Sequence, residues 1–152
     1  MKNLKTILIA WLAVSLLSCG SKDNPTINFI ASDELKKANL PFSEAVVVDN
    51  VIYLSGQIGS GPDVMKLVDG GIQAEAEQAL ENIKNTLERN GSSLENVVKC
   101  TVMLADIAEW AEFNKVYMKY FPNNKPARSA FATNGLALGA RVEIECIAVM
   151  TK

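Results

Sequence analysis

The sequence predicts an α+β domain in which a mixed sheet carries two helices on one of its faces. Strand-like runs come first, two stretches with helical apolar spacing follow with a further strand between them, and alternating strands close the chain. The 152 residues are enough for one domain with a buried core. Because two helices bury only one face of a sheet, the other face stays apolar, and we expect a homo-oligomer.

The N-terminus has the pattern of an export signal. Lys2 and Lys5 precede an apolar run over residues 6–17, which as a helix rises only about 18 Å and is too short for a hydrocarbon core of roughly 30 Å. A positive start before a short apolar run is typical of a secretory signal. The following Leu16-Leu17-Ser18-Cys19-Gly20 resembles a bacterial lipobox.

This resemblance implies that residues 1–18 are a signal peptide and that Cys19 is the lipidated first residue of the mature protein. We therefore expect a protein exported and lipid-anchored to the cell envelope, in the periplasm or on a membrane surface. The alternative is an ordinary secretory signal with a chance cysteine. Residues 19–27 are small and polar up to Pro25, as expected for a flexible tether, and the folded domain takes residues 28–152.

A β-hairpin is the first structured element that the sequence predicts clearly. β-Branched residues 46–48 and the strand-like residues 51–55 flank Asp49-Asn50, two residue types that tolerate the positive φ of a tight turn. Glycines 56, 59, 61, 70 and 71 then interrupt regular structure, without the spacing of a phosphate-binding loop.

Two amphipathic helices and a strand follow. Residues 72–90 place Ile72, Ala76, Ile83 and Leu87 on one stripe, and Gly91 ends this helix. Residues 97–104 are apolar enough for an interior strand. Asp106-Ile107-Ala108-Glu109 has the form of a capping box that opens a second helix. Its apolar face is aromatic, and we expect it to pack in the core; the residues are Trp110, Phe113, Tyr117, Tyr120 and Phe121.

Composition excludes several kinds of chemistry. The chain has no histidine, so Ser-His-Asp triads, Cys–His dyads and histidine-ligated zinc sites are excluded. Any acid–base chemistry must use a carboxylate, Lys, Tyr or Cys, or the backbone and water. The formal charge is −2, and it becomes −4 without the two lysines of the signal, so nucleic acid is not an expected partner. Cys100 and Cys146 each lie in an expected interior strand, where they form either a disulfide or two inert thiols.

Arg128 and Glu143 are the candidate chemical groups near the C-terminus. Arg128 begins an extended run, and Glu143 lies in the alternating strand 142–149, with Glu145 pointing the same way. Arginine grips a carboxylate bidentately, and a glutamate among apolar side chains can serve as a general acid or base. The alternative is a structural ion pair between adjacent strands.

Four sequence motifs together resemble the RidA/YjgF family of reactive-intermediate (enamine/imine) deaminases over residues 26–151. They are Leu54-Ser55-Gly56-Gln57-Ile58, Val98-Lys99-Cys100-Thr101-Val102, Pro126-Ala127-Arg128-Ser129 and Val142-Glu143-Ile144-Glu145-Cys146-Ile147-Ala148-Val149. The resemblance implies a chorismate-mutase-like two-layer fold and a homotrimer whose active sites lie in the clefts between subunits. It also implies that no metal or organic cofactor is needed.

By the same resemblance, Arg128 binds the substrate carboxylate and Glu143 orients or activates the attacking water. Ser55 and Gly56 line the pocket. Ala130 lies where the family often has a cysteine whose backbone contacts the ligand. Phe42 occupies a position that is tyrosine in the best-known members, which removes a hydroxyl from the pocket wall.

The function expected is hydrolysis of 2-iminopropanoate and 2-iminobutanoate to 2-oxo acids and ammonia. Two alternatives stay open: a trimeric protein that binds small carboxylates in the envelope without turnover, and a hydrolase of another imine-like compound. Phe42 and the export signal favour these alternatives. Endoribonuclease activity, a label within this family, is disfavoured by the acidic charge and the absence of a basic, aromatic-rich surface. The enzymatic account requires Arg128 and Glu143 to meet across a seam between subunits, and it fails if the structure places them on opposite faces of the sheet or seals both within a solid interior.

Overall fold

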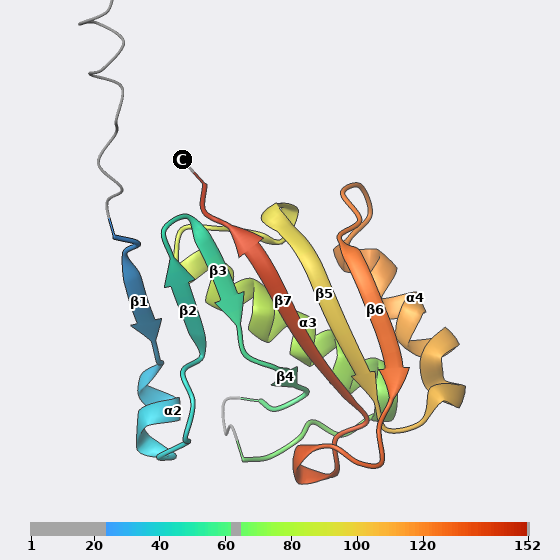
Figure 1. Ribbon diagram of the computed structural model, residues 1–152. Coiled ribbons are helices and arrows are strands. Elements are labelled where there is room, and N and C mark those ends of the chain that lie inside the picture. The colour runs from blue at the N-terminus through green and yellow to red at the C-terminus, as the bar shows by residue number, and fades with distance from the viewer. Residues whose placement is uncertain (1–23, 62–64, 152) are drawn as a thin grey trace, which may run out of the picture.

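The computed structural model describes residues 24–61 and 65–151. Their strands form one mixed sheet in the order β1-β2-β3-β7-β5-β6, with β4 paired to β7 (Figure 1). The strands are β1 (Ile27–Ile30), β2 (Ala45–Val48), β3 (Val51–Leu54), β4 (Gln57–Ile58), β5 (Val97–Leu104), β6 (Ala127–Ala132) and β7 (Val142–Val149). The α-helices are α2 (Asp33–Lys37), α3 (Gly71–Arg89) and α4 (Trp110–Tyr120), and the 3₁₀ turns are η1 (Leu94–Asn96), η2 (Ile107–Glu109) and η3 (Ala137–Gly139).

The predicted hairpin is confirmed. β2 and β3 pair antiparallel with Val48 opposite Val51, and Asp49 adopts a φ of 52° in the turn between them. A left-handed conformation at this position is what an aspartate or asparagine tolerates in a two-residue turn. Thr26 N–H also donates to the Asp49 carboxylate at 2.9 Å, which fixes the start of β1 against the turn.

The centre of the sheet holds the two longest strands. β7 pairs antiparallel with both β3 and β5, and β5 pairs in parallel with the edge strand β6. Helix α4 is the crossover between β5 and β6, as a parallel pair requires. The predicted interior strand 97–104 coincides with β5, and the predicted C-terminal strand coincides with β7.

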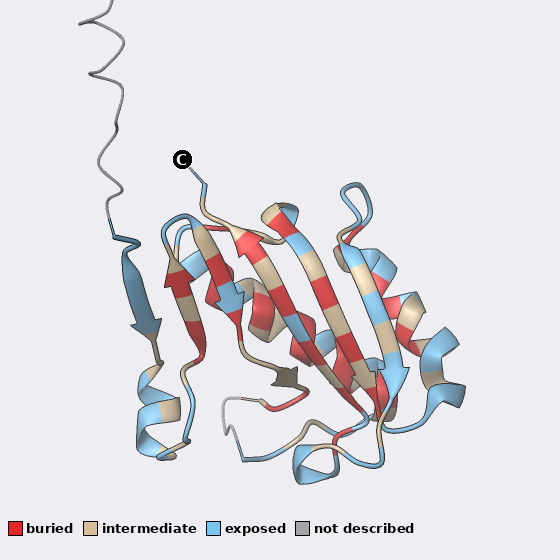
Figure 2. Ribbon diagram, viewed as in Figure 1, coloured by how far each residue is buried: buried red, intermediate tan, exposed pale blue. Residues whose placement is uncertain are grey.

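Helices α3 and α4 cover one face of the sheet and lie behind it in Figure 1. Burial alternates along β7: Val142, Ile144 and Cys146 are buried against the helices, while Glu143 and Glu145 face away (Figure 2). The stripe predicted on α3 is confirmed, because Ile72, Ala76, Ala79, Leu80, Ile83 and Leu87 are all buried. The sequence thus predicted the two-layer arrangement correctly.

The other face of the sheet carries no helix and keeps large side chains in solvent. Phe29, Tyr53 and Phe131 on this face are 75%, 46% and 47% exposed. The strand register places Phe29 and Tyr53 close together on this face, because Phe29 lies opposite Val46, and Tyr53 lies opposite both Val46 and Ile147. We call this surface the open face. An apolar sheet face of this kind is expected to be covered in an oligomer.

Three details differ from the sequence prediction. Helix α2 was not predicted, and it is short and has no buried residue. The second helix begins with the 3₁₀ turn η2, where the Asp106 carboxylate caps Ala108 N–H but Glu109 pairs with Arg141 instead of completing a capping box. Trp110, expected in the core, is 44% exposed, because it lies in the first turn of α4 at the rim of the sheet.

The signal peptide predicted over residues 1–18 and the lipidation predicted at Cys19 lie outside the described residues, as does most of the predicted tether. Within residues 24–61 and 65–151, no helix combines the length and apolar character needed to cross a bilayer. Signal, lipidation and envelope location therefore stay predictions.

Candidate active site

Arg128 lies on the helix-covered side of the edge strand β6. It is in register with Cys100 of β5, whose side chain points into the core. Its guanidinium carbon is 4.6 Å from the centre of the Tyr117 ring and 5.8 Å from the ring centres of Trp110 and Phe113. Cation–π contacts of this kind contribute roughly 0.5–1 kcal/mol each at exposed sites. The aromatic side chains of α4 thus hold the guanidinium in place.

A hydrogen bond completes this placement without neutralising the charge. Arg128 Nη1 donates to Asn114 Oδ1 at 2.8 Å. Within residues 24–61 and 65–151, no carboxylate forms an ion pair with Arg128. A guanidinium that is held in position but has no anionic partner is suited to bind an anionic ligand.

The cavity beside Arg128 has a volume of about 400 Å³. We call it the arginine pocket; its residues are Asn114, Tyr117, Met118, Phe121, Lys125, Pro126 and Arg128. Its walls are mostly apolar, with two cationic side chains among them. Such a cavity fits a small organic acid, whose carboxylate meets the guanidinium while its carbon chain contacts apolar walls.

Glu143 lies in a second cavity, of about 240 Å³. We call it the glutamate pocket; its residues are Leu35, Leu40, Phe42, Gly56, Gln57, Ile58, Ser60, Met65, Ala137, Leu138 and Glu143. Burial among these residues raises the pKa of the Glu143 carboxyl, and the nearby charge of Glu145 raises it further. A carboxyl with a raised pKa is a better proton acceptor at neutral pH than a free glutamate, which suits a general base.

The loop after β3 is built around Glu143. A Cβ placed on Gly56 would lie 1.9 Å from Glu143 Oε1, so only glycine leaves room for the carboxylate. Ser55, next to it, donates its hydroxyl to the Ser43 carbonyl at 2.7 Å and thereby fixes the loop that carries Phe42. Phe42 is 49% exposed at the mouth of the pocket. The structure therefore brings together Phe42, Gly56 and Glu143, whereas Ser55 is not among the residues that line the cavity in one chain.

Arg128 does not join this group, because it lies on the opposite face of the same sheet. Arg128 shares the helix-covered face with Cys100 and Cys146, whereas Glu143 occupies the alternate positions of β7 that point away from the helices. Ala130, two residues after Arg128 on β6, packs against the core on the same side as Arg128. The alternative of a structural Arg128–Glu143 pair within one chain is thus wrong.

Each chain consequently carries two separate candidate half-sites, the arginine pocket and the glutamate pocket. A cleft that contains both groups requires the arginine pocket of one subunit and the glutamate pocket of another, as the RidA resemblance implies. Within one chain the two side chains lie on opposite faces of the sheet, the arrangement stated above to contradict catalysis, so the enzymatic account stands only if the two groups meet across a seam between subunits.

Sequence reasoning missed the residues that hold the arginine. Asn114 lies four residues after Trp110 on α4, and Tyr117 three residues after Asn114, so helical spacing puts all three on adjoining turns. The aromatic spacing on this helix was interpreted as core packing only. The signal that was available is Asn114, a polar residue within the aromatic stripe, which points to a buried partner such as Arg128.

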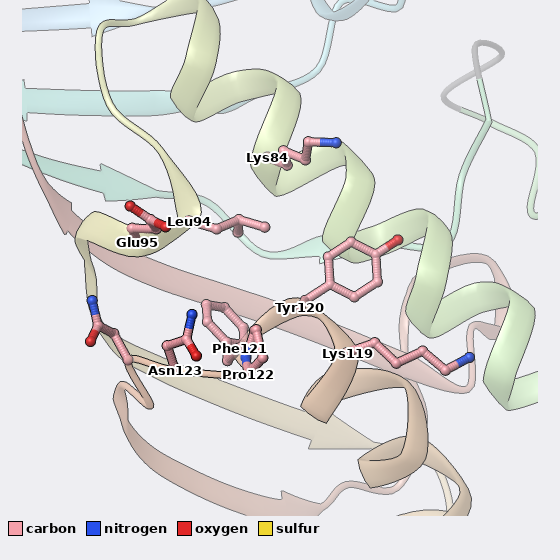
Figure 3. Close-up of a pocket in the computed structure, with 9 residues that line it drawn as sticks. Lys84, Leu94, Glu95, Lys119, Tyr120, Phe121, Pro122 and Asn123 are labelled. Carbon is pink, nitrogen blue, oxygen red and sulfur yellow. The ribbon is translucent and has the colours of Figure 1, made fainter.

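Another cavity lies at the C-terminal end of α4 (Figure 3). It measures about 260 Å³, and its residues are Lys84, Leu94, Glu95, Lys119, Tyr120, Phe121, Pro122, Asn123 and Asn124. None of the site residues predicted from sequence lines it. The Tyr120 hydroxyl in its wall donates to Glu81 at 2.8 Å and is therefore already hydrogen-bonded within the fold.

In the described part of the chain, no three histidine, cysteine or acidic side chains lie close enough to hold a metal ion.

The family model described as endoribonuclease L-PSP matches residues 32–150. The chain belongs to this family, which includes the RidA/YjgF proteins. Yeast (Saccharomyces cerevisiae) Protein HMF1 is 49% identical over 123 residues, which are 81% of this chain and 95% of the relative. The human 2-iminobutanoate/2-iminopropanoate deaminase is 48% identical over 109 residues, 72% of this chain and 80% of the relative.

Solved structures agree with the fold. The crystal structure of RidA from an Antarctic Psychrobacter bacterium aligns with a TM-score of 0.74 at 40% identity, covering 81% of this chain and 99% of that one. A RidA-type mixed α+β fold is thereby established, and a trimer is typical of the family.

Proposed function

We propose that the protein is a homotrimeric hydrolase that deaminates 2-imino acids, with 2-iminopropanoate and 2-iminobutanoate as substrates. The observation that carries this proposal is the Arg128 guanidinium, fixed by Asn114 and three aromatic rings and unpaired with any described carboxylate. Relatives that are 48–50% identical and named 2-iminobutanoate/2-iminopropanoate deaminase support an enzyme of this kind.

The active site then forms between neighbouring subunits. The arginine pocket opens where β6 and α4 form one edge of the subunit, and the glutamate pocket lies beside β4, on the far side of β7. Packing the β6/α4 edge of one subunit against the open face of the next buries Tyr53 and Phe131 and lets both half-sites border one cleft. Such a head-to-tail contact closes into a ring when the rotation permits, and three copies are typical of the family.

The reaction follows from these positions. Arg128 binds the carboxylate of the 2-imino acid bidentately and holds the C=N carbon in the cleft. Glu143 accepts a proton from a water molecule as the water oxygen bonds to that carbon, the C=N π electrons move to nitrogen, and the nitrogen takes the proton from Glu143 and becomes an amine. The carbinolamine then collapses: the ionised Glu143 takes the hydroxyl proton and passes it to the amine, the C–N bond breaks as the C=O bond forms, and ammonia leaves a 2-oxo acid.

Only modest acceleration is required from these groups. Positioning by Arg128 together with one general base, worth on the order of 10²–10⁴-fold, is sufficient for an imine that already hydrolyses in water. The raised pKa of Glu143 lies closer to neutral pH than that of a free glutamate, which makes its carboxylate a stronger general base. No residue of this scheme calls for a cofactor.

One assay tests the proposal. The full chain is added to 2-iminopropanoate generated in situ from alanine by an amino-acid oxidase with catalase, and imine loss is followed beside an Arg128→Ala control. We expect the wild type to exceed the buffer rate by at least tenfold and the variant to match it. If the wild type also follows the buffer rate, the deaminase proposal is wrong.

A second candidate function is binding without turnover, or turnover of another imine-like compound. The specific observation is Phe42, which puts a half-exposed phenyl ring with no hydroxyl at the mouth of the glutamate pocket. Calorimetric titration with pyruvate distinguishes this candidate: binding without any imine hydrolysis favours it over the enzyme.

We also propose that the protein is exported and anchored to the cell envelope by lipid on Cys19. The support is the lipobox-like sequence that ends at this cysteine. Cys19→Ser is expected to move the protein out of the membrane fraction. Unchanged fractionation of this variant would rule out lipidation as the anchor.

A further inference from the structure

Two thiols that the proposed reaction does not use lie in contact within the core. Cys100 on β5 and Cys146 on β7 are directly opposite each other in the antiparallel register. Their Sγ atoms are 2.9 Å apart, and the two residues are 0% and 2% exposed. An S–S bond of about 2.05 Å therefore requires the two sulfur atoms to approach by less than about 1 Å.

We propose that Cys100 and Cys146 are an oxidation site at which a small peroxide closes an intrachain disulfide between β5 and β7. Neither cysteine belongs to the half-sites of the proposed deaminase. The inference does not depend on the reaction or on the export signal, because it concerns the packing of two strands within one subunit.

The surroundings assign different roles to the two sulfur atoms. The Cys146 thiol, the Tyr117 hydroxyl and the Arg128 charge lower the pKa of Cys100, against the opposing effect of burial. Contact with Cys100 and burial raise the pKa of Cys146. Cys100 is also the cysteine that lies in register with the cationic Arg128 on β6, so we assign to it the thiolate that attacks the oxidant and to Cys146 the thiol that resolves the product.

The arginine pocket supplies the approach to Cys100. Two of its residues, Tyr117 and Arg128, are among the groups that lower the pKa of the Cys100 thiol. The Tyr117 hydroxyl is buried and makes no well-formed hydrogen bond to a described residue, although it lies close enough to affect Cys100. Cys100 itself is fully buried, so the oxidant must be small: a peroxide molecule is little larger than water, whereas a bulky disulfide such as oxidised glutathione is too large.

The reaction balances with hydrogen peroxide as the oxidant. The Cys100 thiolate attacks one peroxide oxygen, the O–O bond breaks, and the products are a sulfenic acid and, after protonation, water. The Cys146 sulfur then attacks the sulfenic sulfur, the S–O bond breaks, and a second water leaves. The two sulfurs together lose two electrons and two protons, which the peroxide gains.

The cross-link is expected to stabilise the fold. It spans 46 residues of sequence, and closing a loop of this size restricts the unfolded chain. For a domain of this size the midpoint of thermal unfolding should rise by roughly 5–15 °C.

The test treats the full chain with hydrogen peroxide, denatures it, alkylates free thiols with iodoacetamide and digests it with trypsin. Cleavage after Lys99, Lys115 and Arg141 places the two cysteines in peptides 100–115 and 142–152, apart from Cys19 in peptide 6–22. We expect the two peptides joined, with a mass two hydrogens below their sum, and a raised unfolding midpoint that dithiothreitol reverses.

Two variants complete the experiment. Cys19→Ser removes the cysteine outside the pair and should leave both the joined peptides and the midpoint shift unchanged. Cys146→Ser should abolish both and leave a sulfenic acid on Cys100 that reacts with dimedone. Full alkylation of both peptides from peroxide-treated wild type, with an unchanged midpoint, overturns the proposal even if Cys146→Ser does not fold.

Discussion

Glu143 is the residue whose protonation state controls the proposed reaction. Burial is the main cause of its raised pKa, and the charge of Glu145 is the second. As a general base it must be ionised, so activity falls as the pH drops through its pKa in the folded protein. Because that pKa lies above the value of 4.5 for an unperturbed glutamate, the loss begins at a higher pH than for an exposed carboxylate.

Glu145→Gln is therefore expected to move the acid limb of the pH–kcat profile to lower pH. The variant removes a like charge but keeps the burial of Glu143, so the limb should stay above pH 4.5. Glu143→Gln should lower kcat on the order of 10²-fold or more at every pH. An acid limb that does not move in Glu145→Gln would show that Glu143 is not the group that titrates.

At the scale of elements, residues 55–59, which include β4, and the strand β7 form one unit. Gly56 lies against the Glu143 carboxylate, and Gly59 lies against the backbone of Glu75 on α3. The buried Glu75 carboxylate in turn accepts the Arg141 N–H at 2.8 Å, directly before β7 begins. Helix α3 thus fixes both segments that carry the glutamate pocket.

Gly56→Ala is expected to reduce kcat on the order of 10²-fold while the protein stays folded. The three atoms nearest to the new methyl group all belong to the Glu143 side chain, which can rotate away but then leaves its position beside the substrate. Gly61→Ala is the matched control, because a Cβ there meets nothing within 4 Å and activity should not change. Equal activity of the two variants would show that Glu143 takes no part in the mechanism.

At the scale of the whole molecule, the separation of Arg128 and Glu143 to opposite faces means that one chain cannot hold both ends of the substrate. The exposed aromatic side chains of the open face, Phe29, Tyr53 and Phe131, indicate where another subunit packs. Assembly and catalysis are therefore expected to be coupled in the proposed enzyme, since the proposed contact both buries the open face and completes the cleft.

Mixing two inactive variants tests this coupling. When Arg128→Ala and Glu143→Gln subunits are unfolded together in equal amounts and refolded, three quarters of the trimers contain both, and each mixed ring has one intact cleft of three. Recovered activity should be about a quarter of the wild-type value. No recovery from mixed trimers, verified by native mass spectrometry, would contradict a shared site; each variant refolded alone is the control.

The sequence by itself determined the elements and the chemical groups. Alternating and helical patterns gave α3, β5 and β7 to within two residues, because burial on one face imposes those periods locally. Local motifs likewise singled out Arg128 and Glu143. Tertiary structure decided which face each side chain occupies, how Asn114 and the aromatic rings hold the arginine, and that Cys100 meets Cys146. These depend on register between strands far apart in the chain, which no local pattern encodes.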